Sequence, residues 1–361
     1  MTSTRTTSTP TAGPSPRPGR RVHRRIPAGR ALLTAGAVLA AGAAAAPTAG
    51  ATTWGLADQK ANTFATPAFQ ELRQAGMKTA RYTVRYDALR YKNSRSLGYH
   101  AALLDQWIEG TEAAGVRPLI TFWVTASNSR SLKKRISASR FRTEFRRFRK
   151  AYPEVRDFSL FNEPNLTGPY KNDPAALGRL YSTISKELRN CSSCRLLVGD
   201  LHLTSGRSAA SYALKVRRAA KRPIRIWGLN NYNDVNDRRS TQTSRFLRST
   251  AVKNSKVWIT ESGGVYSRKA SSEKKNPFLA QRRKATSDSA REKYQYDATR
   301  YLNTIAKRYK RQIQRVYVYQ LQSEPNASWN PGSRNGSWDS GLLDPRGEKR
   351  RSFDYFVKHV L

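Results

Sequence analysis

Two glutamates stand where apolar segments of the sequence end, a place where a carboxylate can do chemistry. Glu163 follows the segment 155–161, and Glu261 directly follows Val257-Trp258-Ile259-Thr260. Both segments have the composition of buried strands, and turn-forming residues come after each glutamate. Burial at the rim of a core can raise the pKa of a carboxyl group, which suits a general acid. A pair of such carboxylates is what hydrolysis of a glycosidic bond requires.

The elements that must position this pair follow from the alternation of strand and helix patterns after residue 51. We predict strands at 53–57, 79–84, 116–124, 155–161, 196–200, 224–229, 257–260 and 316–321. We predict helices at 66–76, 97–114, 141–152, 173–190, 209–220, 245–252, 289–313 and 352–360. Thr66-Pro67 and Asp173-Pro174 predict helix starts, and Ser289 with Glu292 predicts a capping box. Eight strand–helix units predict an α/β fold, a single (β/α)8 TIM barrel.

An open doubly wound sheet is the alternative arrangement of these elements. That fold would place a phosphate-binding glycine loop after the first strand, and no such loop follows Gly55. In a barrel the carboxyl ends of all strands face one rim, so Glu163 on the fourth strand and Glu261 on the seventh should converge. A separation of about 5–5.5 Å between the two carboxyl groups would mean that hydrolysis retains the anomeric configuration.

Two motifs around these glutamates resemble those of a known group of enzymes. Asn162-Glu163-Pro164 is similar to the acid/base signature of clan A glycoside hydrolases, closest to families 5 and 39, and Ile259-Thr260-Glu261 is similar to their nucleophile strand. The resemblance implies that Glu163 is the acid/base, that Glu261 is the nucleophile and that Asn162 binds the sugar 2-hydroxyl. It also implies that Arg81, at the second strand, sits beside the nucleophile and keeps it ionised.

Other positions depart from the pattern of that clan. Asn230 stands where clan members often have a histidine, while Tyr232 matches the tyrosine that orients the nucleophile. The eighth strand offers Tyr319-Gln320 in place of a platform tryptophan. The tryptophans that could stack on sugars instead are Trp123, Trp329 and Trp338. We expect Asn162, Arg81, Asn230, Tyr232 and Trp338 to line the substrate site, but the departures leave the sugar and the mode of cleavage open.

The first 51 residues have the composition of a secretory leader. Residues 1–30 carry Arg but no acid, an apolar and Ala-rich run covers 31–46, and Ala49-Gly50-Ala51 is a small-residue cleavage pattern. We therefore expect residues 1–51 to be a signal segment, and residues 52–361 to be a secreted catalytic domain. The apolar run is shorter than the about 20 residues of a membrane span, which disfavours an uncleaved anchor. The pairs of arginines at 20–21 and 24–25 leave the export route open.

The charge of the chain is strongly positive, with 66 Lys and Arg against 25 Asp and Glu and a formal net charge of +41. Such a charge favours polyanionic partners. The basic residues look dispersed along the sequence and accompany no recognition motif, so we expect no specific nucleic-acid partner. The expected partner is a poly- or oligosaccharide substrate, with an anionic cell-wall polymer as a further candidate, and the chain is expected to be a monomer.

Cysteine usage and the carboxylate pair limit the remaining chemistry. Cys191 and Cys194 are the two cysteines, and in an exported chain they predict a disulfide that closes a small loop. Two carboxylates and a water hydrolyse a glycoside unaided, so we expect no cofactor and no metal. The sequence thus predicts a secreted retaining O-glycosyl hydrolase acting on a β-linked glycan. The alternative is a non-catalytic basic barrel that binds anionic cell-wall polysaccharide.

Overall fold

The computed structural model of the 361-residue chain describes residues 52–95, 98–124, 136–166, 168–204, 206–268, 284–323 and 338–361. The expected leader, residues 1–51, and Trp329 lie outside the described residues, so the domain boundary at residue 51 stays a prediction. No helix in the described ranges is long and apolar enough to cross a membrane.

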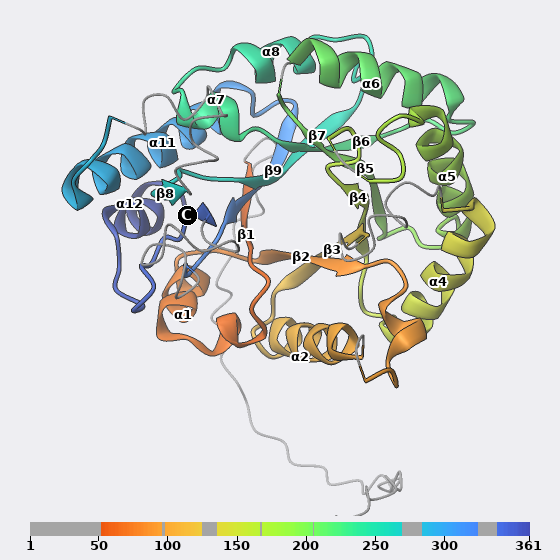
Figure 1. Cartoon of the computed structure of the whole chain (residues 1–361), viewed down its shortest axis with the longest axis horizontal. Coiled ribbons are helices and arrows are strands. Elements are labelled where there is room, and N and C mark those ends of the chain that lie inside the picture. Colours follow the sequence, from red (N-terminus) through yellow and green to blue (C-terminus); the bar gives the residue numbers. More distant parts are fainter. Residues whose placement is uncertain are drawn as a thin grey trace, which may run out of the picture. The chain divides into compact units, whose positions relative to one another are not determined.

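Eight parallel strands form a closed barrel in the order β1-β2-β3-β4-β5-β6-β7-β9 (Figure 1). They are β1 Thr53–Ala57, β2 Thr79–Arg85, β3 Arg117–Trp123, β4 Asp157–Asn162, β5 Arg195–His202, β6 Ile226–Asn230, β7 Lys256–Ser262 and β9 Ile313–Tyr319. Every strand pairs with its neighbour in sequence, and β9 pairs with β1 to close the barrel. The predicted (β/α)8 barrel is confirmed.

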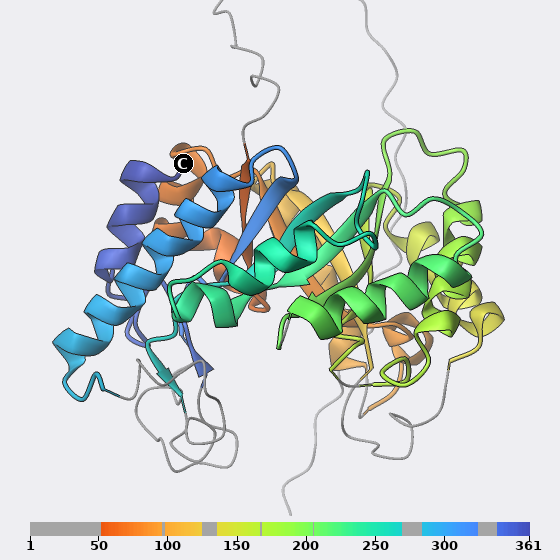
Figure 2. The same cartoon turned by 90° about the horizontal axis from the view of Figure 1, so that it is seen from above.

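Helices surround the barrel and supply the crossovers between strands (Figures 1 and 2). They are α1 Pro67–Gln74, α2 Tyr99–Ala113, α4 Ala138–Ala151, α5 Pro174–Glu187, α6 Gly206–Ala219, α7 Tyr232–Asn236, α8 Thr241–Leu247, α11 Asp288–Arg308 and α12 Arg351–His359, with short 3₁₀ turns at Ala61–Ala65 and Ala88–Tyr91. Their apolar faces pack on the sheet, as in α4, whose Phe141, Phe145 and Phe148 are buried around Phe122 of β3.

The barrel interior has an apolar layer and, above it, a polar one. A cluster of strand residues fills the interior below the site: Ala57, Leu119, Leu197, Ile226, Trp258 and Tyr317. Closer to the carboxyl ends of the strands, Arg81, Thr121, Ser159 and Asp200 are fully buried and hydrogen-bonded to one another. A buried polar layer of this kind is stable only because each member has partners, and it forms the floor of the site described below.

Two of the three predicted helix caps are found where the sequence placed them. The Thr66 hydroxyl accepts a hydrogen bond from Phe69 N at 3.2 Å, and the Asp173 carboxylate accepts one from Ala176 N at 2.9 Å. A proline follows each cap at the first helical position, where its missing N–H costs nothing.

The third cap, the box formed by Ser289 and Glu292, is wrong. Ser287 caps α11, because its hydroxyl reaches Ala290 N at 3.2 Å, and the helix ends at Arg308. Glu292 instead accepts from Arg351 N at 2.8 Å, at the start of α12. With Ser287 as the cap, the third helical residue is Ala290, so no capping box forms, and Glu292 contacts α12, which lies beside α11 (Figure 2).

A two-stranded antiparallel sheet at the rim, β8 Ser267–Arg268 with β10 Trp338–Asp339, was not predicted. Strands of two residues carry no period that a sequence pattern can reveal. The pair joins the segment after β7 to the segment after β9, and so brings Trp338 to the rim near the end of β7.

Candidate active site

Glu163 and Glu261 come from the carboxyl ends of β4 and β7, as the barrel topology requires. Glu163 lies just beyond β4 with a positive φ of 46°, a conformation that a non-glycine residue adopts at a cost. Its backbone N–H donates to Asp200 O at 3.1 Å, which ties the turn to β5. Each glutamate side chain keeps 19% of its surface exposed, so both carboxylates are largely enclosed yet reachable.

Arg81 of β2 connects the two halves of the site. Its side chain is fully buried, and Nη1 donates to Glu261 Oε2 at 2.9 Å while Nη2 donates to Asn162 Oδ1 at 2.8 Å. Nη2 also contacts Asp200 Oδ2 at 2.6 Å. The Arg81 guanidinium thus holds Glu261 and Asn162, the residue before Glu163, in fixed positions relative to each other.

Asp200, near the end of β5, was not singled out from the sequence. Its carboxylate is fully buried and accepts from Arg81, from Thr121 Oγ1 at 2.9 Å and from Ser159 Oγ at 2.6 Å. Its negative charge compensates the Arg81 cation, which is why a guanidinium can be buried here at all. An acid that ends the apolar run 196–199 is the signal that could have revealed it.

Glu261 is held by two donors that contact different oxygens. Arg81 occupies Oε2, and the Tyr232 hydroxyl donates to Oε1 at 3.1 Å. Burial raises the pKa of Glu261 above its ordinary value, and the negative charge of Glu163 adds to the rise, although the Arg81 cation opposes both. The expected contact with Arg81 is present, but burial outweighs its effect on the pKa.

Glu163 accepts two hydrogen bonds on the same oxygen. His202 Nδ1 lies 2.8 Å from Glu163 Oε1, and Asn230 Nδ2 lies 3.1 Å from it. Burial raises the pKa of Glu163, but the hydrogen bond and charge of His202, the Asn230 amide and the Arg81 cation together lower it below the ordinary value. The raised pKa expected for Glu163 from burial alone is therefore wrong for this structure.

His202 is a second residue that the sequence did not single out. The side chain of Asn165 clamps its backbone, with Nδ2 donating to His202 O at 2.8 Å and Oδ1 accepting from His202 N at 2.9 Å. The turn that carries Glu163 thereby fixes the histidine that contacts Glu163. In the sequence His202 stands alone, two residues past Asp200, and belongs to no motif. Its contact with Glu163 arises because β4 and β5 pair in the barrel.

Asn230 and Tyr232, both predicted site residues, lie at the end of β6 and the start of α7. Thr260 Oγ1 donates to Asn230 Oδ1 at 3.1 Å, which turns the Asn230 amide nitrogen toward Glu163. Burial, then the charge of Glu261, raises the pKa of Tyr232 well above its ordinary value, so its hydroxyl stays a donor. Asn230 thus donates to Glu163, and Tyr232 donates to Glu261.

The tryptophan candidates fall in two places. Trp338 meets the Tyr232 ring edge-on, with centroids 4.8 Å apart, and its Nε1 donates to Ser340 Oγ at 3.0 Å. Trp123 instead lines a small cavity of about 140 Å³ together with Phe161, Asn162 and Tyr170. The predicted site residues Arg81, Asn162, Glu163, Asn230, Tyr232, Glu261 and Trp338 are therefore brought together by direct contacts, and Trp123 borders the Asn162 side.

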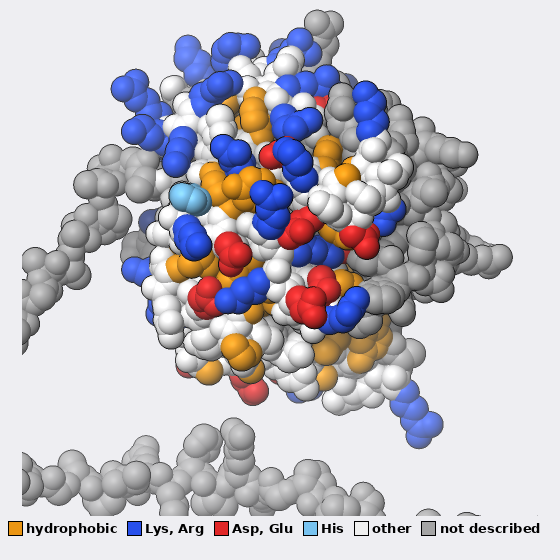
Figure 3. Space-filling view, turned by 90° about the vertical axis from the view of Figure 1, so that its left-hand side faces the viewer, with side chains coloured by type: hydrophobic (Ala, Val, Ile, Leu, Met, Phe, Trp, Pro, Cys, Tyr) orange, Lys and Arg blue, Asp and Glu red, His pale blue; other side chains and the backbone are white. Residues whose placement is uncertain are grey.

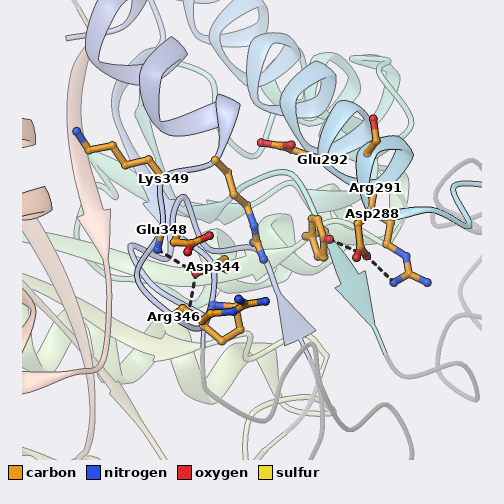
Figure 4. A pocket seen from close by; sticks show the side chains of 11 residues that line it. Asp288, Arg291, Glu292, Asp344, Arg346, Glu348 and Lys349 are labelled. Carbon is orange, nitrogen blue, oxygen red and sulfur yellow. Dashed lines mark hydrogen bonds and ion pairs between the residues drawn. The ribbon is translucent and has the colours of Figure 1, made fainter.

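A separate hollow of about 600 Å³ lies between the starts of α11 and α12 (Figure 4). Its charged lining is mixed in sign, and much of it is paired: Asp288 accepts from Tyr266 OH at 3.0 Å, and Asp344 accepts from two backbone N–H groups of its own loop. None of the predicted site residues lines it. Within the described ranges, no cluster of three or more His, Cys, Asp or Glu residues could hold a metal ion.

Comparison with known proteins finds relatives by structure only. No family model and no curated protein matches the chain. An endo-1,4-β-xylanase from Caldicellulosiruptor owensensis is similar with a TM-score of 0.58 and 12% identity, over 85% of this chain and 97% of the other. A family 1 β-glucosidase from Thermotoga maritima gives 0.54 and 11%, over 86% and 97%. A family 39 glycoside hydrolase from Bacteroides cellulosilyticus gives 0.52 and 17%, over 84% of this chain and 62% of that longer one.

At these identities the likeness establishes the fold. The structural neighbours are clan A glycoside hydrolases with a parallel eight-stranded barrel, in agreement with the resemblance of the two glutamate motifs. The chain thus shares the (β/α)8 barrel of these glycoside hydrolases, and its two strand-end glutamates lie where β4 and β7 of its barrel end.

Proposed function

We propose that the protein is a retaining glycoside hydrolase that cleaves a β-linked poly- or oligosaccharide by double displacement. The observation that carries the proposal is the carboxylate pair from β4 and β7, joined through Arg81 and Asn162. The structural neighbours, which include a β-glucosidase and a β-xylanase, support the class of reaction.

Each residue of the site has a task in this proposal. Glu261, held at both oxygens by Arg81 and Tyr232, attacks the anomeric carbon, and the glycosidic bond breaks as Glu163 protonates the leaving oxygen. Water then attacks the glycosyl–Glu261 ester, and Glu163 takes its proton. Asn162, which accepts a hydrogen bond from Arg81, binds the sugar 2-hydroxyl in this proposal.

In the unbound site the pKa of Glu163 is lowered and that of Glu261 is raised, the opposite of the order that these tasks require. Charge coupling between the two glutamates acts against that order. The charge of Glu163 raises the pKa of Glu261, and the interaction is mutual. An ionised Glu261 therefore raises the pKa of Glu163 and favours its acid form before attack. Formation of the ester removes that charge, so the pKa of Glu163 falls and the base form is favoured for the second step.

The test is hydrolysis of aryl β-glycosides and β-linked polysaccharides by the mature chain, with the anomer of the first product read by NMR. Glu261→Gln should lower kcat by about 10⁴-fold or more, because the nucleophile is lost. Glu163→Gln should lower it about 10²–10⁴-fold, with the smaller loss on substrates whose leaving group needs no proton. Glu154→Gln, at an exposed position with no ion pair in the described part of the chain, is the matched control.

Full turnover by either glutamate variant, or inversion at the anomeric carbon, would contradict the proposal. No hydrolysis across the substrate panel, together with retention on an anionic glycan, would favour the alternative, a non-catalytic basic barrel that binds cell-wall polysaccharide.

We further propose that the chain is exported as a monomer after loss of residues 1–51. The basis is the leader composition of that segment. Mass spectrometry of the protein recovered from the medium should give a chain that starts near Thr52.

A further inference from the structure

The amino-terminal mouth of the barrel, at the opposite end from Glu163 and Glu261, is surrounded by basic residues. Six successive strands, β2 to β7, begin at or directly after Lys or Arg. These six residues, the mouth cations, are Lys78, Arg117, Arg156, Arg195, Arg225 and Lys256. The sequence suggested dispersed charge, but parallel closure of the barrel gathers these positions at one end.

The mouth cations lie next to one another in pairs on adjacent strands. In each pair the backbone N–H of one member donates to the carbonyl of the other: Arg117 to Lys78 at 2.9 Å, Arg195 to Arg156 at 2.8 Å and Lys256 to Arg225 at 2.8 Å. Like charges placed side by side in a sheet destabilise it. The helix dipole favours basic residues in the last turns of helices but not at the starts of strands. Arg117, Arg195 and Lys256 do stabilise loops at this end by donating to backbone carbonyls, but these bonds do not account for the placement of like charges in pairs.

Few acids neutralise the mouth cations. The buried Asp157 pairs with Arg117, at 2.5 Å, and also with Arg315, at 2.6 Å, so that one acid serves two cations. Arg195, Arg225 and Lys256 are exposed and form no ion pair within the described ranges. The other acids of this end are Glu112, Glu154 and Glu187, the last of which is paired with Arg146.

The connecting loops add to the positive charge at this end. Exposed basic residues follow α6, α8 and α11: Lys221, Arg222, Lys253, Lys310 and Arg311. Figure 3 shows the molecule from the side of α11 and α12, where Lys and Arg side chains cover the upper part and Asp and Glu gather lower down. The charge at the mouth itself follows from the residues named above.

The surface lacks the features that other polyanions need. The exposed large apolar side chains of the described chain are Tyr99, Leu103 and Leu166, none of them in a mouth loop, and the aromatic residue of the loop before β9, Tyr309, is only partly exposed. A single partly exposed tyrosine is not a platform on which successive bases can stack, and a bilayer finds no exposed apolar anchor there. What remains is recognition of regularly spaced anionic groups by Lys and Arg.

We propose that the amino-terminal mouth binds a linear acidic polysaccharide, through its carboxylate or sulfate groups, and leaves the catalytic rim free. A strand of seven residues spans about 20 Å, so the two ends of the barrel act on different stretches of polymer. The choice of a glycan among charged polymers rests on the proposed function, but binding itself does not, since it needs no turnover.

The test compares two variants that lose the same charge. The mouth variant carries Arg195→Gln, Arg225→Gln, Lys253→Gln and Lys256→Gln. The control variant carries Lys92→Gln, Arg95→Gln, Arg142→Gln and Lys171→Gln, all exposed and on segments that follow the carboxyl ends of β2, β3 and β4. Binding to heparin is measured at several salt concentrations. Binding to a DNA duplex and to phosphatidylserine vesicles is measured under the same conditions for comparison. Thermal unfolding checks that both variants fold.

We expect the mouth variant to bind heparin about tenfold or more weakly at 0.15 M salt and to show a shallower salt dependence, since fewer counterions are released. The control should stay within about twofold of the parent chain, and all three should hydrolyse a small aryl glycoside equally. Equal loss in both variants, or in neither, overturns the site. Binding of DNA or vesicles as tight as that of heparin overturns the assignment to a glycan. Loss of hydrolysis alone bears on the proposed function and leaves the heparin result intact.

Discussion

His202 Nδ1 and Glu163 Oε1 lie 2.8 Å apart, and the side chain of Asn165, two residues after Glu163, holds the histidine backbone in place. The turn that presents the proposed acid thus also positions a group that controls its protonation. Asn230 cannot carry a proton where the clan often has a histidine, and His202 approaches the same carboxylate from the neighbouring strand, β5.

His202→Ala should move the pH profile of hydrolysis. Without the His202 donor, burial should raise the pKa of Glu163, because less opposes it. Glu163 then keeps its proton to higher pH. The part of the pH profile of kcat/KM that reports the ionisation of Glu163 should therefore move to higher pH. A charge-assisted hydrogen bond of about 1.5–3 kcal/mol corresponds to about 1–2 pH units. His202→Asn, which can keep a donor near the same place, is the control. A uniform loss of rate at every pH would mean that His202 only supports the fold.

The two glutamates should affect stability with opposite signs. The folded pKa of Glu163 is lowered, so its stabilisation is present above the unfolded pKa of about 4.3 and is lost as the pH falls through the folded value. The folded pKa of Glu261 is raised, so its contribution is present below about 4.3 and is lost as the pH rises through the folded value.

At pH 7, therefore, Glu163→Gln should lower the unfolding temperature and Glu261→Gln should raise it. Both differences should shrink at pH 4 and below, and thermal scans across this range measure them. The same sign for both variants at pH 7 would show that the local hydrogen bonds, not the charges, set their stability.

Arg81→Lys should be strongly destabilising although it keeps the charge. One ammonium group cannot hold Asp200, Glu261 and Asn162 in the frame that the guanidinium makes. A buried carboxylate left without its partner costs about 3–5 kcal/mol, which urea unfolding can measure. Arg179→Lys, at a half-exposed residue 3.9 Å from Asp173, should cost under about 1 kcal/mol. Similar losses in the two variants would contradict the role given to Arg81.

We expect Arg350 to hold Trp338 in position through Asp339. Arg350 makes a buried two-pronged ion pair with Asp339, with Nη1 at 2.7 Å from Oδ1 and Nη2 at 2.8 Å from Oδ2, and Asp339 is the neighbour of Trp338 in β10. Arg350→Met should cost about 3–5 kcal/mol and raise KM more than it lowers kcat. Adding Asp339→Asn should recover part of the stability, because it removes the unpaired charge. An unchanged KM in the folded variant would separate Trp338 from substrate binding.

The disulfide between Cys191 and Cys194 confirms the predicted pairing, and its Cα atoms lie 5.3 Å apart. A loop this small should contribute about 2 kcal/mol through the unfolded state. Replacing both cysteines with serine should lower stability by that amount or less. The loop also accepts hydrogen bonds from Arg117 and Arg195, so heparin binding should weaken slightly in the same variant. A loss well above about 2 kcal/mol would show that the disulfide also stabilises the folded loop, and would contradict an effect through the unfolded state alone.

The sequence by itself determined the barrel and the pair of glutamates. Eight alternating strand and helix patterns leave few topologies, and parallel closure must bring the carboxyl ends of β4 and β7 to one rim. Arg81 and Tyr232 could be named because they stand in motifs that resemble known ones.

Only the tertiary structure decided what surrounds the pair. Asp200 and His202 act through contacts between strands, which no local period records, and the lowered pKa of Glu163 follows from donors on β5 and β6. The same holds for the mouth cations, which lie far apart in the sequence. Each is an ordinary surface residue along the chain, and the register of neighbouring parallel strands makes them one surface.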